Sequence, residues 1–314
     1  MKYLVTGGAG FIGSHIIQHF LNRNYEVLCL DNFDLCYDIL RKRANISPFL
    51  QQENFELVEG DIRDEGLLQK IVQDTECIFH EAAQVSVVES MKDPFKTIEI
   101  NSIGTLKVLN AALKYNVKKI IIASSAAVYG DSPEIPKKEN MLPSPKSPYA
   151  ISKLDCEYFA KLFYEEYGLR TTILRYFNVY GPRQDPTSPY AAAIPIFIRQ
   201  ASKNDNIVIF GDGSQTRDFV YVKDVVQANE LVMSKGDGKI LNVANSSSIS
   251  IIELARQIIE LMGSSSKIVF KEPRTGDIKH SLADIDDISK VGFKPKYDLK
   301  KGLIETIEWF RKNG

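Results

Sequence analysis

A short apolar strand that runs straight into a glycine-rich turn constrains the fold of this chain more than any other feature. The predicted strand at residues 2–6 is followed at once by Gly7, Gly10 and Gly13, and a helical pattern begins among these glycines. Glycine lets the turn close, and the free backbone N–H groups at a helix N-terminus attract phosphate. The pattern predicts a βαβ unit that binds the pyrophosphate of a dinucleotide.

An aspartate at the end of the second predicted strand indicates which dinucleotide binds. Asp31 lies 18 residues beyond Gly13 and follows the strand-like run at residues 26–30. A carboxylate at this place accepts hydrogen bonds from the ribose hydroxyls and repels a 2′-phosphate, which favours NAD over NADP. A helix N-cap or a surface aspartate is the alternative. After the third strand, Asp61 and Ile62 are positioned to frame the adenine, unless Asp61 simply forms a turn.

The first 175 residues alternate β-branched runs with amphipathic helical stretches. Further strand-like runs occur at residues 55–58, 77–79, 119–123 and 171–174. The rhythm predicts an α/β fold, a Rossmann-type doubly wound parallel sheet covered by helices. After Asn178 prolines crowd around Gly181, which indicates a smaller C-terminal α/β substrate-binding lobe. We therefore place an NAD-binding domain at residues 1–177, to which the segment 217–246 returns, and the second lobe at residues 178–314.

The composition is that of a globular protein with a small ligand. The chain has 314 residues, 44% of them hydrophobic, and a formal net charge of −1. Lys and Arg are mixed with Asp and Glu, which argues against a nucleic-acid-binding field and against a polybasic membrane patch. No apolar run reaches the ~18 residues of a membrane span, and the chain starts with a strand where a signal peptide would stand. We therefore predict a cytoplasmic protein.

The four cysteines predict neither a metal site nor a redox pair. They are scattered without CxxC spacing and without a histidine cluster, at Cys29, Cys36, Cys77 and Cys156. We expect no bound metal and a reduced compartment.

A tyrosine and a lysine four residues apart form a candidate proton-transfer pair. On one helix Tyr149 and Lys153 share a face, so that the ammonium can stabilise a phenolate. The same spacing recurs at Tyr115/Lys119 and at Tyr297/Lys301. Only the first pair follows a helix N-cap, Ser147, and a proline suited to the first helical position, Pro148. With the serine-rich strand end at Ser125 upstream, this context singles out Tyr149 for catalysis.

Several motifs together resemble the extended short-chain dehydrogenase/reductase family, specifically its nucleotide-sugar epimerase/dehydratase branch. They are the glycine turn, Ser124-Ser125, Tyr149–Lys153, His80–Ala83, Asn101, Arg175–Pro182, Phe210–Gly213, Arg217-Asp218 and Arg274–Asp277. The resemblance covers nearly the whole chain. It implies that Tyr149 is the catalytic base, that Lys153 assists it and holds the nicotinamide ribose, and that Ser125 hydrogen-bonds the sugar oxygen being oxidised.

The resemblance also implies the remaining contacts to NAD and an assembly. The further cofactor-binding residues that we expect are Phe11, Ile12, Asn32, Ala82, Ala83 and Asn101. Members of the family resemble one another in forming homodimers, and here the implied interface lies on the helices around residues 103–115 and 149–167.

The residues after Ser125 discriminate between the reactions of this branch. Relatives that resemble 4,6-dehydratases carry an acidic pair at the next positions, because elimination of water needs an acid and a base. Decarboxylases of the branch resemble one another in a glutamate there. This chain has Ala126 and Ala127, whose methyl groups transfer no protons. What remains is 4-epimerisation: Tyr149 removes the 4-hydroxyl proton while hydride passes to the nicotinamide, the 4-keto sugar turns over, and the hydride returns to its other face.

A UDP-sugar carries about two negative charges, so its site should supply cations and amide donors. By resemblance to the epimerases, Arg217 and Arg274 are expected to hold the diphosphate and Asn178 to donate to it. Asp277 is expected to contact the uridine ribose.

The sugar itself is expected to meet a different set of side chains. Ser86 lies where relatives touch the sugar, and Arg183 and Gln184 are candidates for the rim of its pocket. Ser281 matches a position where galactose-type epimerases carry a bulky tyrosine. Serine leaves room for a 2-acetamido group, so we predict activity on both UDP-N-acetylglucosamine and UDP-glucose.

Two alternatives remain open. A UDP-glucuronate 4-epimerase would use the same machinery and could employ Arg183 to meet the carboxylate. A non-catalytic NAD-binding sensor or scaffold would keep the glycine turn and Asp31 but would not need the proton-transfer pair. Reduction of the cofactor on addition of a UDP-sugar distinguishes an enzyme from a sensor.

Overall fold

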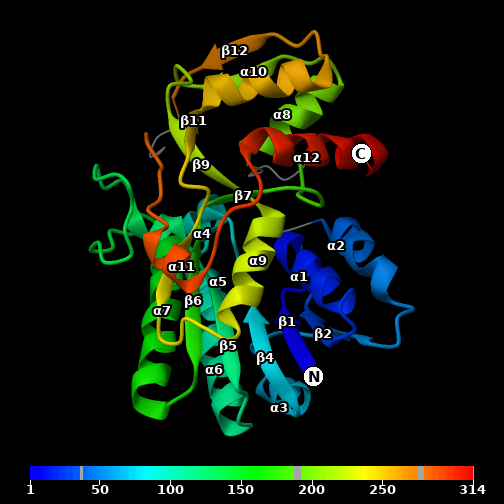
Figure 1. Ribbon diagram of the computed structural model, residues 1–314, viewed down its shortest axis with the longest axis vertical. Coiled ribbons are helices and arrows are strands. Elements are labelled where there is room, and N and C mark those ends of the chain that lie inside the picture. Colours follow the sequence, from blue (N-terminus) through cyan, green and yellow to red (C-terminus); the bar gives the residue numbers. More distant parts are fainter. Residues whose placement is uncertain (36–37, 187–191, 274–278, 314) are drawn as a thin grey trace.

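A seven-stranded parallel sheet forms the centre of the larger part of the protein (Figure 1). The computed structural model describes residues 1–35, 38–186, 192–273 and 279–313. The strand order is β10-β6-β5-β4-β1-β2-β3. The bounds are Lys2–Thr6 for β1, Glu26–Asp31 for β2, Phe55–Glu59 for β3, Thr75–His80 for β4, Lys119–Ser125 for β5, Thr171–Tyr176 for β6 and Ile240–Val243 for β10. The predicted fold class, a doubly wound Rossmann-type sheet, is confirmed.

Helices cover both faces of this sheet and bury its strands. One face packs against α1 (Phe11–Leu21), α2 (Ile39–Ile46), α9 (Val222–Val232) and α11 (Asp286–Val291). The other packs against α3 (Glu65–Ile71), α6 (Gly104–Lys114) and α7 (Pro148–Tyr167). Strands covered on both faces must be apolar at nearly every position, which explains their unbroken runs of Val, Ile and Leu.

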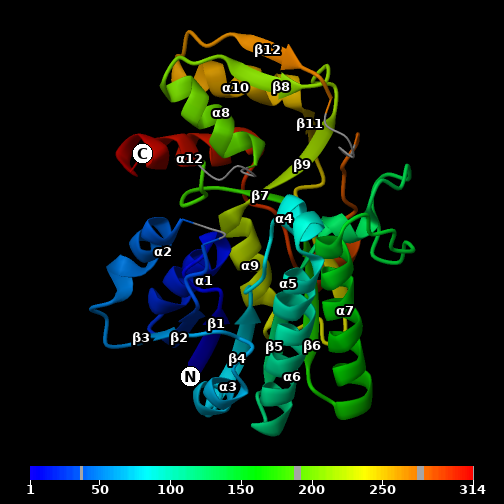
Figure 2. The ribbon, with the colours of Figure 1, turned by 180° about the vertical axis from the view of Figure 1, so that it is seen from behind.

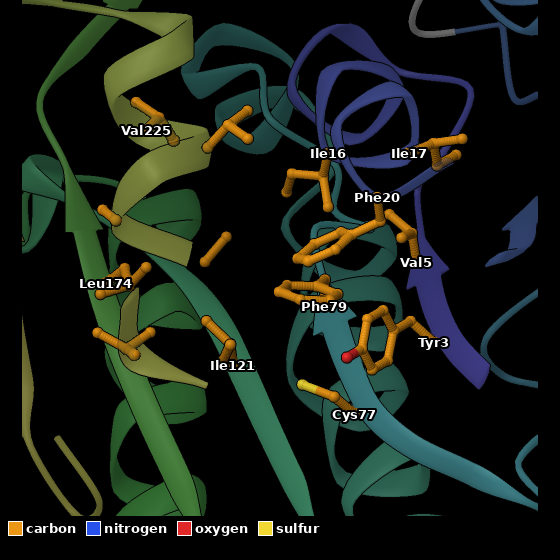
Figure 3. Packing of buried hydrophobic residues seen from close by; sticks show 14 of the residues in the cluster. Tyr3, Val5, Ile16, Ile17, Phe20, Cys77, Phe79, Ile121, Leu174 and Val225 are labelled. Carbon is orange, nitrogen blue, oxygen red and sulfur yellow. The ribbon is translucent and has the colours of Figure 1, made fainter. Parts of the chain in front are cut away.

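Aromatic packing fixes α1 onto the middle of the sheet (Figure 3). The ring of Phe20 lies 4.9 Å from that of Phe79 on β4 and 5.0 Å from that of Tyr3 on β1. All three side chains are almost completely buried. The contact fixes the C-terminal end of α1 against the sheet, while the short turn after β1 keeps the N-terminus of α1 at the C-terminal end of β1. That end is where a ligand of such sheets binds.

Helix α7 begins and ends where its sequence predicts. The Ser147 side chain accepts the N–H of Ala150, Pro148 occupies the first turn, and Gly168 ends the helix in a left-handed conformation. Shorter elements connect the rest of this part: 3₁₀ turns at Ser47–Phe49 and Ala126–Tyr129, α4 (Val87–Lys92), α5 (Pro94–Ile98) and a π-helical turn at Glu99–Ile103.

A smaller lobe lies beyond the C-terminal ends of the strands (Figures 1 and 2). It contains a three-stranded sheet of β11 (Ser248–Ser250), β9 (Thr216–Tyr221) and β7 (Asn178–Tyr180), and a parallel pair of β12 (Ile268–Lys271) and β8 (Ile207–Phe210). Its helices are α8 (Ala193–Ser202), α10 (Ile251–Met262) and α12 (Leu299–Asn313). Within the segment 217–246, β10 is a strand of the large sheet and α9 packs on that sheet. Strand β9, by contrast, is part of the small three-stranded sheet. Along the described chain, no helix is long and apolar enough to cross a membrane.

Candidate active site

A cavity of about 470 Å³ lies at the C-terminal ends of the central strands, where the two lobes meet. Its size falls within the ordinary range for a small-molecule site. The residues that line it come from the turn after β1, the ends of β2, β4, β5 and β6, and the start of α7.

The glycine turn forms one wall of the cavity by close backbone approaches. Gly7 has φ +67°, and a Cβ there would stand 2.8 Å from the backbone of Ala82. A Cβ on Gly13 would stand 2.4 Å from the carbonyl oxygen of Gly7. By contrast, a Cβ on Gly10 meets only that same oxygen, at 3.1 Å, so the turn is open on this side. Gly10 caps α1, whose first N–H groups therefore form a cradle that fits a pyrophosphate.

Asp31 is buried at the edge of the cavity and is held by several donors. Its carboxylate accepts the N–H of Ala9 at 3.2 Å and of Phe33 at 2.8 Å. Lys42, on α2, adds an ion pair of 3.0 Å. A carboxylate offers about four acceptor positions, so this set leaves capacity for a ribose hydroxyl. The contact of Lys42 with Asp31 could not be predicted from the sequence, because nothing in the spacing of α2 marks it.

The loops after β2 and β3 are tied together beside Asp31. Asn32 donates to Asp61 at 3.0 Å, and the guanidinium of Arg63 donates to both carboxylate oxygens of Asp61, at 2.9 and 2.8 Å. These hydrogen bonds, chiefly those from Arg63, lower the pKa of Asp61 to about 2. Asn32, Asp61 and the buried Ile62 all line the cavity, at the place where the sequence predicted the adenine.

The loop after β4 forms the opposite wall. Ala82, Ala83 and Ser86 line the cavity, and the Ser86 hydroxyl also caps α4 by accepting the N–H of Glu89. Asn101, by contrast, lies behind the loop. It accepts the N–H of Gln84 at 2.8 Å and donates to the Gln84 carbonyl at 3.0 Å. Asn101 thus supports the wall from the π-helical turn, and it is not among the described lining residues.

The predicted catalytic side chains share the cavity. Ser125 ends β5, and Tyr149 and Lys153 stand on the first turns of α7. The Ser125 hydroxyl accepts the N–H of Ala127 at 3.1 Å, which leaves its hydrogen for a ligand. The Lys153 ammonium donates one hydrogen bond to the Ala123 carbonyl at 2.8 Å and retains two further N–H groups.

The other two Tyr/Lys pairs have structural roles. Lys119 is buried in an ion pair with Asp237 and donates to Thr172 at 2.6 Å. Lys301 stacks over the ring of Tyr297 at 4.1 Å in the smaller lobe. Neither pair appears among the described residues that line the cavity.

A buried ion pair supports the catalytic strand end from behind. Arg175 donates to both oxygens of Glu157, at 2.9 and 2.7 Å, and Ser124 donates to the same carboxylate at 2.5 Å. Because these groups are completely buried, removal of one partner would leave an uncompensated charge. The network links β5, β6 and α7 next to the reactive groups.

The comparisons with known proteins agree with this geometry. Residues 3–244 match the NAD dependent epimerase/dehydratase family. The chain belongs to this family. It is 41% identical over 312 residues to a putative UDP-glucose 4-epimerase of Methanocaldococcus jannaschii, covering 99% of this chain and 98% of that protein. Its cofactor is therefore NAD, and the glycine cradle and Asp31 are the groups that fit it.

Two further relatives of this epimerase/dehydratase chain differ in their reactions. The structure of a UDP-N-acetylglucosamine 4-epimerase from Methanobrevibacter ruminantium superimposes with a TM-score of 0.94 at 40% identity, covering 100% of this chain and 99% of that one. A UDP-N-acetyl-α-D-glucosaminuronate decarboxylase of Bacillus cytotoxicus is 37% identical over 323 residues, covering 99% of this chain and 98% of that protein. Since the family contains several reactions, the chemistry has to be argued from the residues of the site.

The residues predicted for the substrate are less completely assembled than those for NAD. Asn178 donates its amide to the Asp218 carbonyl at 2.8 Å, and Arg217 donates to the Thr216 carbonyl at 2.9 Å. The half-buried Ser281 lies beside Arg217, because its N–H donates to the Thr216 carbonyl at 3.1 Å. These side chains are not among the described lining residues of the cavity. The predicted roles of Arg274 and Asp277 fall outside the described residues.

Arg183 lies against α1 and is not among the described residues that line the cavity. Its guanidinium donates to the Ser14 carbonyl at 2.9 Å and to Gln18 at 2.7 Å, both on α1. Burial lowers the pKa of Arg183 to about 10. The side chain thus fastens its own turn to α1, whereas its neighbour Gln184 lines the cavity as predicted for the rim.

The sequence reasoning also left out several residues that line the cavity. Glu81 and Tyr176 stand next to the catalytic group, and Asp185 forms an ion pair of 3.2 Å with Arg41 on α2. Glu81 belongs to the motif that followed β4, which was the only signal for it. Tyr176 likewise belongs to the Arg175–Pro182 motif. Asp185 had no signal, because its position depends on how the lobes pack.

Proposed function

We propose that this protein is a UDP-sugar 4-epimerase that oxidises and re-reduces the sugar at C4. The observation that carries the proposal is the shared cavity of Ser125, Tyr149 and Lys153, next to a dinucleotide cradle. Ala126 and Ala127 follow Ser125 and offer no acid or base. The Ala127 N–H instead supports the Ser125 hydroxyl, and Ala126 packs against a small apolar cluster. The reaction that needs no additional proton-transfer group is epimerisation.

Tyr149, Ser125 and Lys153 each have a separate role in transferring the proton of the sugar 4-hydroxyl. Tyr149, as a phenolate, accepts the proton of the 4-hydroxyl, and the Ser125 hydroxyl donates a hydrogen bond to the same sugar oxygen. Lys153 stabilises the phenolate with an N–H group that Ala123 leaves unused. Bound NAD supplies the hydride acceptor and then the hydride donor. The 4-keto sugar turns within the cavity so that the hydride returns to the opposite face of C4, and Tyr149 returns the proton to the 4-oxygen.

The substrates are both the acetylated and the non-acetylated UDP-hexoses, with a preference for UDP-N-acetylglucosamine. The small side chain of Ser281 beside Arg217 supports this proposal, because serine occupies less space than the tyrosine of galactose-type epimerases. The relatives named for UDP-glucose and for UDP-N-acetylglucosamine are similarly close in sequence. In the same scheme Arg217 and Arg274 hold the diphosphate, Asn178 donates to it and Asp277 contacts the ribose.

The protein acts as a homodimer. Helices α4, α5 and α7 lie beside one another at one side of the large sheet (Figure 2). They carry exposed apolar side chains at Val88, Met91, Phe95, Tyr158 and Leu162. Tyr158 and Leu162 are one turn apart on α7, and a second copy would cover them as it packs helix against helix. The buried, unpaired thiols of Cys29, Cys77 and Cys156 agree with a cytoplasmic location. Light scattering of a Tyr158→Glu, Leu162→Glu variant should show a monomer where the wild type shows a dimer.

Incubation with a panel of UDP-sugars tests the function. Resolution of the product epimers should show interconversion of UDP-N-acetylglucosamine with UDP-N-acetylgalactosamine and of UDP-glucose with UDP-galactose. Turnover of UDP-glucuronate alone would support the rival epimerase, although the placement of Arg183 against α1 disfavours it. If no UDP-sugar is epimerised and none reduces the cofactor, the protein is not this enzyme.

A further inference from the structure

One acidic side chain in the cavity has no part in the proton chemistry described above. Glu81 follows β4 and lines the same cavity as Ser125, Tyr149 and Lys153. Its side chain is half-buried, because it faces this cavity and not the outer surface. A carboxylate in such a place loses hydration, and its presence therefore requires an explanation.

A chain of hydrogen bonds holds Glu81 in the role of an acceptor. The amide nitrogen of Asn229, on α9, donates to the Tyr176 hydroxyl at 2.8 Å. That hydroxyl donates in turn to the Glu81 carboxylate at 2.7 Å. The Asn229 amide is itself oriented, because it also donates to the Val225 carbonyl at 2.9 Å. Donors aligned in one direction stabilise the ionised form of Glu81.

Other groups around Glu81 set the charge at this end of the cavity. Burial raises the pKa of Glu81 to about 7, although the hydrogen bond from Tyr176 and the positive charge of Lys153 both act to lower it. The strand ends of β1 and β5 contribute only the uncharged Thr6, Ser124 and Ser125. His80 stays neutral, because burial lowers its pKa to about 3. Lys153 is thus the cation that opposes Glu81 here.

We propose that the Glu81 carboxylate, held by Tyr176 and Asn229, makes the cavity favour oxidised over reduced nicotinamide. The inference rests on the cofactor site of the proposed function. The nicotinamide must lie near Tyr149 and Ser125, because a hydride passes directly between ring and sugar. The ring carries a positive charge only when it is oxidised. A carboxylate at the same end of the cavity therefore attracts NAD⁺ and not NADH, while Lys153 acts in the opposite sense.

The opposing charges of Glu81 and Lys153 affect how long the 4-keto sugar persists. A site with Lys153 alone would favour the neutral reduced ring and so prolong the life of the 4-keto sugar, which can then escape. The negative charge of Glu81 drives the hydride back to the sugar. Glu81 thereby helps to return each turnover to the starting form of the cofactor.

A competition between the two forms of the cofactor tests the proposal. The protein is equilibrated with known mixtures of NAD⁺ and NADH, unbound dinucleotide is removed, and the bound ratio is measured after extraction. At pH 8.5 Glu81→Gln should lower the preference for NAD⁺ about tenfold, the size expected for unit charges about 12 Å apart at an effective dielectric of about 20. At pH 5.5 the two proteins should agree, because the wild-type carboxyl is then protonated.

Two further variants keep the test independent of misfolding. Tyr176→Phe removes the donor to the carboxylate and should move the midpoint of the wild-type pH profile upward without removing the high-pH preference. Glu139→Gln is the matched control, because burial also raises the pKa of Glu139, which accepts the Asn242 N–H at 2.7 Å and does not line the cavity. This control should bind the same NAD⁺ to NADH ratio as the wild type.

The outcomes separate this proposal from the proposed function. An unchanged ratio in Glu81→Gln at pH 8.5, or a wild-type ratio that does not vary with pH, overturns the role of Glu81. Failure of every UDP-sugar to react overturns the epimerase but leaves the dinucleotide ratio to be read as before. A tenfold shift that disappears at pH 5.5 supports the proposal whatever the sugar proves to be.

Discussion

The cofactor half and the substrate half of this site differ in what builds them. The NAD side consists mainly of backbone: the glycine turn, the first N–H groups of α1 and the loop after β4. The proposed substrate side depends on long side chains such as Arg217, whose guanidinium here donates to its neighbour's carbonyl. A site made of backbone is present as soon as the fold forms, whereas one made of arginines needs the anion to orient it.

The largest expected loss falls where the two halves meet. Tyr149→Phe removes the only proton acceptor in the proposed scheme and should lower the epimerisation rate about 10³-fold, within the range for general acid–base catalysis. Chromatographic separation of the epimers measures it. Binding of NAD should persist, because the cradle and Asp31 are untouched. A variant with near-normal rates would remove Tyr149 from the mechanism.

The second-largest effect is expected from a substitution in the cofactor half, at Gly13. In Gly13→Ala the new Cβ would stand 2.4 Å from the Gly7 carbonyl, and backbone on both sides prevents an easy adjustment. We expect a loss of about 1–3 kcal/mol in the free energy of unfolding, together with weakened NAD binding. Urea denaturation and NAD titration measure the two effects.

A glycine in a different setting supplies the control for Gly13. Gly66 lies in the first turn of α3, where a Cβ comes no closer than 3.4 Å, to the side chain of Asp64. Gly66→Ala should leave NAD binding unchanged and should preserve or raise stability by up to about 1 kcal/mol. If both alanine variants behave alike, the close backbone approach at Gly13 does not matter.

The substrate half should respond through affinity for the sugar nucleotide. Arg217→Gln should raise KM for the UDP-sugar by about 10- to 100-fold, the effect of losing a hydrogen bond to a charged group. The NAD⁺ to NADH binding ratio should stay as in the wild type. Steady-state kinetics with UDP-glucose provides the measurement, and an unchanged KM would argue that the diphosphate lies elsewhere.

The smallest effect concerns the choice between sugars. Ser281→Tyr fills the space proposed for the 2-acetamido group and should lower kcat/KM for UDP-N-acetylglucosamine about tenfold, while UDP-glucose is turned over as before. Competition between the two substrates in one vessel measures the ratio directly. No turnover of the acetylated sugar by the wild type, unchanged in this variant, would contradict the role of Ser281.

The difference between the backbone-built cofactor half and the side-chain-built substrate half also explains which features could be predicted from the sequence. Periodicity placed the strands and the longer helices, because each must bury a continuous apolar face. The glycine turn and Asp31 follow from their distance to strand ends, which is a local property of the chain. The fold and the dinucleotide site were therefore accessible without coordinates.

Contacts between distant segments were not accessible in this way. Lys42 reaches Asp31, at the end of β2, from helix α2, and Glu81 depends on Tyr176 at the end of a strand two places away in the sheet. Arg183 was expected at the sugar, but the turn that carries it docks on α1 and gives its guanidinium other partners. Tertiary packing decides such contacts, and hydrophobic periodicity does not record it.

The ion pair between Arg41 and Asp185 joins α2 to the turn that leads into the second lobe, at the edge of the cavity. Because Asp185 lines the cavity, the ion pair ties the two lobes together beside the proposed dinucleotide site. An ordinary dehydrogenase must exchange its cofactor in every cycle, but a catalyst that returns the hydride has no such need. An ion pair that ties the lobes together beside the cofactor therefore adds no obligatory opening step to the cycle of such a catalyst.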